Sequence, residues 1–243
     1  LNPGGPGGSG TGMVATAAAS YTPEMLASYD LVGFDPRGVG QSTPITCWTD
    51  DEIKQSLTAP DDGSTNPMKP LKGVTSKNVP AQDKIDRGAT NAASCAKHSK
   101  VPELLDHVGT RDVARDLDIL RATNGNAKLN YLGTSYGTYI GAIYADLFPG
   151  RVGRVVLDSA MDPTLSRQGS FEGDAAAEEQ TLRTYIESQQ GQAGFPLSGT
   201  TDEAVSRLAT FLDGLDAKPL TVSDGGDPVD RAEATTAIRT LVV

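Results

Sequence analysis

The pentapeptide Gly133-Thr134-Ser135-Tyr136-Gly137 constrains the fold of this 243-residue chain more than any other segment. The apolar residues before it predict a strand over 129–132, and small residues, Thr138 among them, line a helix predicted over 136–148. A serine between a strand and a helix is held with positive φ and presents its hydroxyl beside the N–H groups that open the helix. We therefore predict that Ser135 is a catalytic nucleophile; the alternative is a tight turn without chemistry.

The elements around this turn alternate between strands and helices. Apolar runs predict further strands over 29–34 and 152–157, and helical spacing predicts a helix that Thr110 caps and Asn124 ends. Such an alternation favours a parallel sheet with crossover helices. The predicted fold class is therefore α/β.

Two domains are predicted. Residues 1–162 carry the sheet, with a long excursion at about 43–102 that is rich in Pro, Asn, Asp, Ser and Lys and holds a helix near 82–97. Residues 163–243 contain no strand of core quality and predict a helical cap, with helices over 172–190, to 215 and to 242. The last two open with capping boxes at 200–203 and 230–233.

The glycine-rich segment from Asn2 to Gly10 is the second strong feature. Acyl transfer needs two N–H groups aimed at the oxygen that becomes negative. One comes from the residue after the nucleophile, Tyr136, and the other from a glycine-rich loop after an earlier strand. We expect Gly5 to be that second donor, with Gly4 the next choice.

A dinucleotide-binding domain is the rival interpretation of the same loop. Residues 5–10 fit GxGxxG, and Asp35 ends the following strand. Against this, Pro6 stiffens a loop whose amides should wrap a pyrophosphate, and the serine turn downstream stays unexplained.

Two cysteines, Cys47 and Cys95, lie in the excursion. They form either a disulfide, which an excursion of that length favours and which implies an oxidising compartment, or two unpaired buried thiols. Together with His98 and His107 they do not offer the spacing of a zinc site. No metal or other cofactor is predicted.

The charge and hydropathy exclude other partners. A formal net charge of −10 disfavours nucleic acid as a partner, and no segment reaches the roughly 18 apolar residues of a membrane span.

Three segments, Asn2–Gly10, Gly33–Ser42 and Leu132–Pro163, together resemble the prolyl and tripeptidyl aminopeptidase family of α/β-hydrolases, especially its secreted bacterial tripeptidyl branch. The resemblance implies an α/β-hydrolase core under a helical cap. It also implies a serine peptidase that removes short peptides or single residues from free N-termini, and a secreted or cell-envelope location.

Carried over by residue, the resemblance makes Ser135 the nucleophile and assigns the oxyanion N–H groups to Gly5 and Tyr136. Asp35 and Arg37 match a motif that braces the loop beneath the site or forms a structural salt bridge. The cap cysteines of many secreted members have no counterpart over 180–200, which leaves cap-based specificity open.

The general base is missing from the expected place. This fold orders its triad as Ser, acid, His, but His98 and His107 both precede Ser135. Asp158 ends a strand and is a candidate acid, although the resemblance places the acid beyond Val243. We expect a chain truncated at both ends, inactive alone, with the remainder of the same protein completing the triad.

Carboxylates early in the predicted cap are candidates for binding the substrate's α-ammonium, namely Glu172, Asp174, Glu178 and Glu179. Their alternative role is a solvated helix face. The competing functions are an esterase or other small-molecule hydrolase, the dinucleotide-binding domain, and an inactive interaction module on a hydrolase scaffold.

Overall fold

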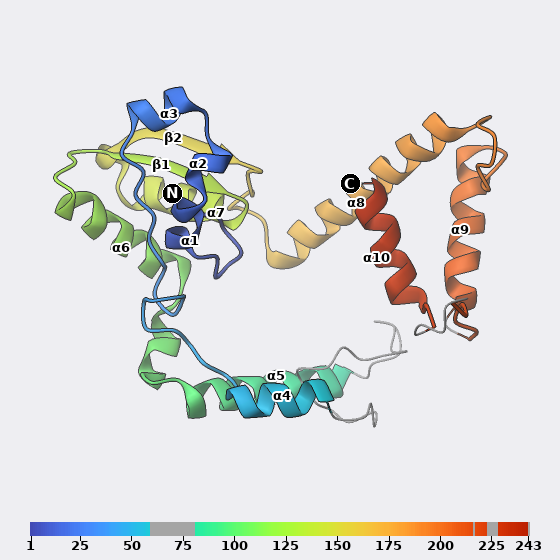
Figure 1. The fold of residues 1–243 in the computed structure, drawn as a ribbon, viewed down its shortest axis with the longest axis horizontal. Coiled ribbons are helices and arrows are strands. Elements are labelled where there is room, and N and C mark those ends of the chain that lie inside the picture. The colour runs from blue at the N-terminus through green and yellow to red at the C-terminus, as the bar shows by residue number, and fades with distance from the viewer. Residues whose placement is uncertain (59–80, 216, 223–227, 243) are drawn as a thin grey trace. The chain divides into compact units, whose positions relative to one another are not determined.

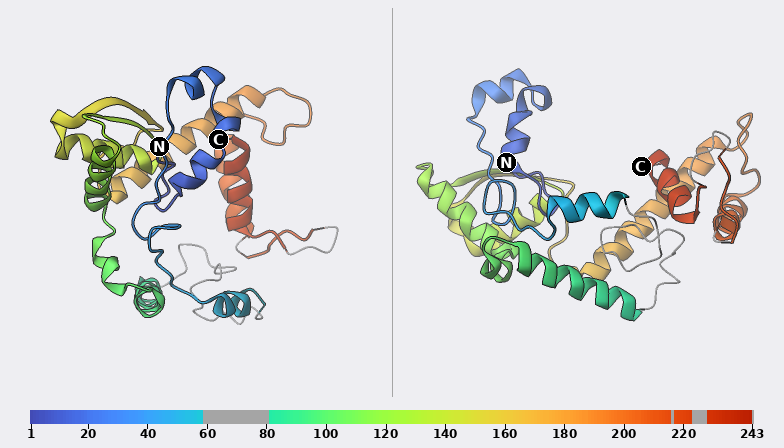
Figure 2. Two further views of the ribbon diagram at one scale, coloured as in Figure 1. Left: turned by 60° about the vertical axis from the view of Figure 1, so that its left-hand side comes forward. Right: turned by 60° about the horizontal axis from the view of Figure 1, so that its bottom comes forward.

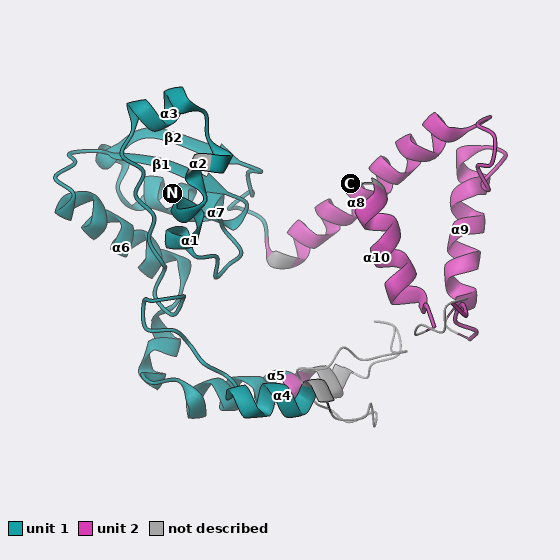
Figure 3. Cartoon of the chain, viewed as in Figure 1, with its two compact units in different colours: residues 1–58, 88–165 teal, residues 59–87, 166–243 magenta. Residues whose placement is uncertain are grey.

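The computed structural model describes residues 1–58, 81–215, 217–222 and 228–242 (Figures 1 and 2). The chain forms two compact units (Figure 3). Unit 1 comprises residues 1–58 and 88–165, and unit 2 comprises residues 59–87 and 166–243. The predicted division into a sheet domain and a cap stays a prediction, and each unit is described by itself.

Unit 1 is built on a parallel sheet. Strand β1 (Leu129–Thr134) pairs in parallel with β2 (Val152–Asp158), both within a residue or two of the predicted bounds. On the other side of β1, Asn2 forms a parallel bridge with Gly133, and the start of the chain lies beside β1 in each view of Figures 1 and 2. This is the parallel arrangement that the alternation of elements predicts.

Two helices cover the sheet. Helix α7 (Tyr136–Leu147) connects β1 to β2 and packs on both strands, and α6 (Thr110–Thr123) packs against α7. Their buried contacts form one core, made of Val113, Ala114, Leu117, Leu129, Tyr131, Ile140 and Tyr144. The parallel sheet with flanking helices confirms the predicted fold class.

The predicted strand over 29–34 is wrong as a regular strand. Leu1 N donates to Val32 O at 2.8 Å and Gly10 N donates to Phe34 O at 3.2 Å, but no ladder forms among the described residues. Val32 is 49% exposed. The neighbouring segment leaves the sheet at Pro3 to enter the glycine-rich loop, so the apolar run meets too few pairing partners.

The predicted cap of α6 also differs. Gly109 is the N-cap, with no side-chain hydrogen bond, and Thr110 is the first helical residue. The Thr110 hydroxyl instead hydrogen-bonds with the Tyr136 hydroxyl, next to the predicted nucleophile. The Thr110 hydroxyl, which the local sequence predicts to cap the helix, therefore bonds to a residue distant in sequence instead.

The described parts of the opening and of the excursion contain several helices. The opening holds three short helices that the sequence did not predict: α1 (Gly10–Ala15), α2 (Ala17–Ser20) and α3 (Pro23–Ser28). The excursion holds α4 (Asp50–Thr58) and the predicted helix, α5 (Ala81–His98), while short 3-10 helices span Pro102–His107 (η1) and Pro149–Arg151 (η2). The Cys47–Cys95 disulfide is confirmed. Residues 59–80 of the excursion lie outside the described ranges.

Unit 2 contains α8 (Arg167–Gln189), α9 (Thr201–Leu215) and α10 (Arg231–Val242), which bury Ile186, Ala204, Leu215 and Ala234. Both predicted capping boxes are confirmed. Thr200 N donates to Glu203 Oε2 at 2.8 Å and Glu203 N donates to Thr200 Oγ1 at 3.3 Å. Asp230 and Glu233 exchange the same two bonds before α10.

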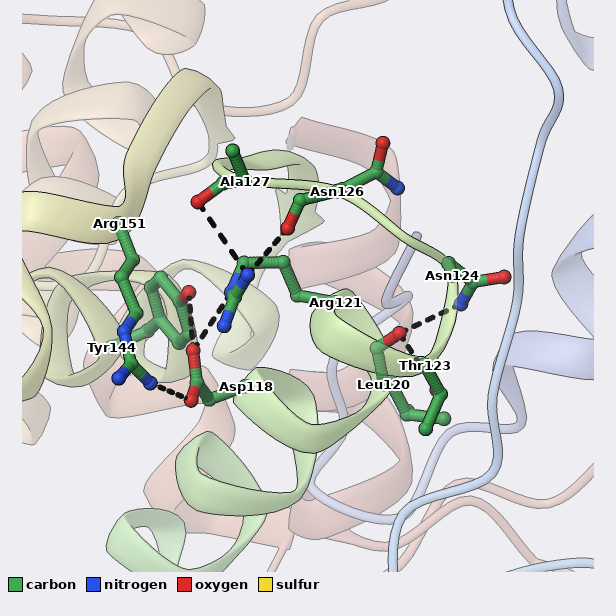
Figure 4. A network of polar contacts seen from close by, with 9 residues as sticks. All are labelled: Asp118, Leu120, Arg121, Thr123, Asn124, Asn126, Ala127, Tyr144 and Arg151. Atoms are coloured by element: carbon green, nitrogen blue, oxygen red, sulfur yellow. Dashed lines mark hydrogen bonds and ion pairs between the residues drawn. The ribbon is translucent and has the colours of Figure 1, made fainter.

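A buried carboxylate ties α6 to α7 (Figure 4). Asp118 accepts from Arg121 Nε at 2.8 Å, from the Tyr144 hydroxyl at 3.1 Å and from Arg151. The hydrogen bond from Arg121 lowers the pKa of Asp118 below its usual range. Arg121 also donates to the carbonyls of Asn126 and Ala127, just before β1. The network thus fixes the helix that supports β1 and α7.

Asp118→Ala is expected to lower the Tm by about 5 °C or more, because it leaves Arg121 and the Tyr144 hydroxyl without their buried partner. Arg115→Ala is the matched control, because it breaks the exposed i,i+3 pair with Asp112 on the same helix. That change should move the Tm by no more than about 2 °C. Thermal unfolding followed by circular dichroism checks both, and equal shifts would contradict the structural role of Asp118.

Candidate active site

Ser135 stands at the turn between β1 and α7. It is the N-cap of α7, with φ 55° and ψ −124°, a backbone conformation that costs energy for any residue other than glycine. Its N–H donates to Asp158 O at 2.9 Å, so the turn is tied to the end of β2. The side chain is exposed, and within the described part of the chain its hydroxyl has no hydrogen-bond partner. An exposed hydroxyl at a strained turn is the presentation expected of a nucleophile, which also needs a hydrogen-bonded general base for activation.

The glycine-rich loop lies directly against this turn. Gly4, at φ 89°, approaches so closely that a Cβ there would lie 2.8 Å from Tyr136 N. Asn2, only 1% exposed, accepts from Gly4 N at 2.9 Å through Oδ1. Within the described ranges, neither Gly5 N–H nor Tyr136 N–H donates to a protein acceptor. The loop and the turn at Ser135 between β1 and α7, called the elbow below, therefore bring two uncommitted amides into one region.

Asn2 also fixes the loop to the sheet. Its N–H donates to Leu132 O at 3.0 Å, and its carbonyl accepts from Thr134 N at 3.0 Å, one residue before the nucleophile. Gly137 packs so tightly against it that a Cβ there would lie 2.9 Å from Asn2 Oδ1. Side chains at Gly4 or Gly137 would therefore push the loop and the elbow apart.

Asp35 braces the far side of the same loop. Its Oδ1 accepts from the Ser9 hydroxyl at 2.6 Å and the Thr11 hydroxyl at 2.8 Å, and its Oδ2 accepts from Gln41 N at 2.9 Å. These bonds, above all the one from Ser9, hold the pKa of Asp35 well below its usual range. Because the carboxylate is committed to the loop, it is not presented as the ribose partner that the dinucleotide interpretation needs.

Arg37 serves a different connection. Its guanidinium donates to both carboxylate oxygens of Asp116 on α6, at 2.7 and 2.6 Å, and to His107 O at 2.9 Å. Asp35 thus braces the glycine-rich loop, whereas Arg37 forms a salt bridge with Asp116. Neither contacts Ser135 in the described structure.

Among the described contacts, the two histidines are also away from the nucleophile. His98 Nδ1 lies 3.0 Å from Cys47 O and its Nε2 lies 3.7 Å from Glu52, within the excursion. His107 contributes a backbone carbonyl to Arg37. Asp158 has an exposed side chain and offers its backbone carbonyl to Ser135. In the described part of unit 1, Ser135 therefore has no histidine against it.

Residues 1–192 match the model of the alpha/beta hydrolase fold family. The chain belongs to the α/β-hydrolase family. It is 42% identical over 183 residues to the tripeptidyl aminopeptidase of Streptomyces coelicolor, covering 73% of this chain and 31% of that protein. It is 35% identical to serine protease Hip1 of Mycobacterium tuberculosis, covering 88% of this chain and 39% of that protein. It is also 35% identical to carboxylesterase B of the same organism, covering 92% and 41%.

This α/β-hydrolase chain spans well under half of the length of these relatives. Two of the three bear peptidase names and one an esterase name, and the similarity to the tripeptidyl aminopeptidase agrees with the resemblance seen in the motifs. In the described residues no three His, Cys, Asp or Glu side chains are grouped to hold a metal ion. Nor does any described helix combine the length and apolar character needed to cross a bilayer.

The acidic residues expected to bind an amine lie on α8 of unit 2. Glu178 pairs with Arg239, and Glu179 pairs with Arg183 at 2.9 Å. Glu172 accepts from Gln168 Nε2 at 2.8 Å and has no cationic partner in the described chain. Of the four expected residues, Glu172 and Asp174 have no cationic partner among the described contacts.

Sequence reasoning missed the polar residues that support the α/β-hydrolase elbow. Asn2, Thr110 and Thr138 each place a side-chain oxygen in a bond to the loop, to Tyr136 or to Ser135. Asn2 lies inside a motif whose glycines carry the stronger signal, and the size of Thr138 by itself indicates only a small packing residue. A buried polar residue beside an elbow motif is the signal that was available.

Asp35→Asn is expected to make unfolding less sensitive to acid. A carboxyl whose folded pKa is depressed stabilises the folded state above its unfolded pKa of roughly 4, and that stability is lost as the pH falls toward the lower folded pKa. The wild type should therefore lose stability between about pH 5 and pH 2 more steeply than Asp35→Asn. Denaturant unfolding across this range measures the slopes. Equal slopes for the wild type and Asp35→Asn would refute the assignment.

Proposed function

We propose that this chain supplies the nucleophile and the oxyanion site of a serine aminopeptidase that releases short peptides or single residues from free N-termini. The observation that carries the proposal is the exposed Ser135 hydroxyl at a strained turn, beside the uncommitted N–H groups of Gly5 and Tyr136. The similarity to a tripeptidyl aminopeptidase and to a serine protease supports a peptidase over other hydrolases.

In the proposed reaction Ser135 Oγ attacks the scissile carbonyl carbon and gives its proton to a general base. The carbonyl oxygen becomes negative and receives the N–H groups of Gly5 and Tyr136, near the positive end of α7. The C–N bond then breaks, the leaving amine takes the proton from the base, and water hydrolyses the acyl-enzyme. Each oxyanion donor of this kind contributes about 3 kcal/mol of transition-state stabilisation.

Gly5 is preferred over Gly4 as the loop donor for a physical reason. The Gly4 N–H already donates to Asn2 Oδ1, so using it for the oxyanion would leave a buried acceptor unpaired. The Gly5 N–H has no such commitment. The bond to Asn2 therefore supports the choice of Gly5.

The base and acid are proposed to lie outside these 243 residues. Neither histidine of this chain contacts Ser135 in the described structure, and the chain's span of 31% to 41% of its relatives leaves room for both groups. The acid is then not Asp158, whose exposed side chain has no described histidine to orient.

We propose a secreted or cell-envelope location. The Cys47–Cys95 disulfide supports it, because disulfides persist mainly in oxidising compartments. The proposed partners are peptides with free N-termini, and the formal net charge of −10 argues against nucleic acid.

An esterase is the second candidate. The 35% identity to carboxylesterase B over 92% of this chain favours it directly. Both functions use the same nucleophile and oxyanion site, so they differ only in what the rest of the protein admits to Ser135.

A fluorophosphonate probe is expected to label the protein encoded by the whole gene at one residue, Ser135, and Ser135→Ala should abolish the labelling. Mass spectrometry of the labelled peptide makes the measurement. Ser159→Ala is the matched control, because it removes a second serine with positive φ at the end of β2 and should leave the labelling intact. Labelling at any other residue would remove the central assignment.

Glu172→Gln is expected to raise the KM for peptides with free N-termini about tenfold, since neutralising a carboxylate removes a charge-assisted bond to the α-ammonium. The KM for simple esters should stay unchanged. Glu187→Gln, on the same helix, is the control and should change neither KM. A similar rise for peptides and esters would count against amine recognition, and faster turnover of peptides with blocked N-termini would favour an endopeptidase or esterase instead.

A further inference from the structure

The backbone of Ser135 is held at both of its polar atoms. Its N–H donates to Asp158 O, and its carbonyl accepts two bonds from Thr138, one from the N–H at 2.9 Å and one from Oγ1 at 2.6 Å. The hydrogen bond from the Thr138 N–H is made by the helix backbone. The hydrogen bond from the Thr138 hydroxyl depends on the side chain at position 138. A strained conformation persists only where its surroundings over-determine it, and the hydroxyl is one of those restraints.

The Thr138 hydroxyl has a second task. Its Oγ1 accepts from Met161 N at 2.9 Å, so one oxygen joins the nucleophile's carbonyl to the loop that follows β2. The side chain is fully buried, at 0% exposure, and water does not compete for either bond. Valine has nearly the same shape but neither donates nor accepts, and it would leave Met161 N–H without its partner.

We propose that Thr138 is a positioning residue for Ser135: its hydroxyl holds the nucleophile's peptide in the strained conformation and ties that peptide to the 158–161 loop. The inference rests on the proposed function, because it takes Ser135 as the nucleophile. Without this bond the Ser135 peptide relaxes, and the directions of its Oγ and of the following Tyr136 N–H change together. A misplacement of about 1 Å at a reacting group lowers a rate by about 100-fold.

The test compares Thr138→Val, which keeps the shape, with Thr138→Ser, which keeps the hydroxyl. The measured quantity is the second-order rate constant of fluorophosphonate labelling at Ser135, normalised to the fraction of protein that can be labelled, with the Tm recorded in parallel. Thr138→Val should label about 10- to 100-fold more slowly than wild type, and Thr138→Ser within about threefold of it. Thr123→Val is the control, because Thr123 makes the same hydroxyl-to-carbonyl bond at the end of α6, to Leu120 O at 3.0 Å. It should label at the wild-type rate.

The outcomes separate the inference from the function. If Thr138→Val lowers the Tm but labels at the wild-type rate per active site, or if Thr138→Ser is as slow as Thr138→Val, the positioning role is wrong while the proposed nucleophile stands. If the wild type is not labelled at Ser135, the proposed function itself fails. Should Thr138→Val not fold, Thr138→Cys replaces it. The thiol is a weaker donor, so its labelling must be slower than that of Thr138→Ser, and equal rates overturn the inference.

Discussion

The structure of unit 1 depends on holding one non-glycine residue at positive φ between a strand and a helix. Ser135 reaches this conformation because β1 ends beside β2, whose last carbonyl accepts the Ser135 N–H. In the first turn of α7, the N–H and the hydroxyl of Thr138 then donate to the Ser135 carbonyl. Strain of this kind is maintained by the packing around it, and the core shared by β1, α6 and α7 supplies that packing.

The glycine-rich loop is organised around Asn2 in the same way. The main chain of Asn2 extends the sheet by one bridge, and its side chain accepts a hydrogen bond from the Gly4 N–H. The loop therefore cannot shift without breaking the sheet register beside the nucleophile. On the other side, Asp35 collects the hydroxyls of Ser9 and Thr11. The loop is anchored at both ends, and its middle, around Gly5, is left with an uncommitted amide. Preorganised donors of this kind act without reorganising during a reaction.

Elements with strong local signals were predicted well from the sequence. The capping boxes at 200–203 and 230–233 need only residues three apart, and β1 and α7 are framed by the elbow and by Pro149. The disulfide was favoured over free thiols by the length of the excursion and is present. The sharp turn at Ser135 followed from the motif, because strand, turn and helix are all encoded within a few residues, and the role of Ser135 as nucleophile stays a prediction.

The failures share one cause, which is that tertiary partners decide the outcome. The 29–34 run has strand-forming residues, but its neighbour leaves the sheet after Asn2, so a ladder does not form. Thr110 has a good N-cap residue type, but its hydroxyl bonds to Tyr136. Thr138 has the size of a packing residue, and the bond that its oxygen accepts from Met161 N joins it to a residue 23 positions later. None of these partners is close in sequence.

The division between chemistry and recognition follows from where these restraints lie. Every bond described at Ser135, Gly4 and Asp35 is made within unit 1, so the turn at Ser135 and the glycine-rich loop are held by contacts of unit 1. The carboxylates proposed to read a free amine belong to α8 of unit 2, where Arg239 and Arg183 already neutralise two of them. Relatives of similar identity bear both peptidase and esterase names, as expected where one scaffold supports several chemistries.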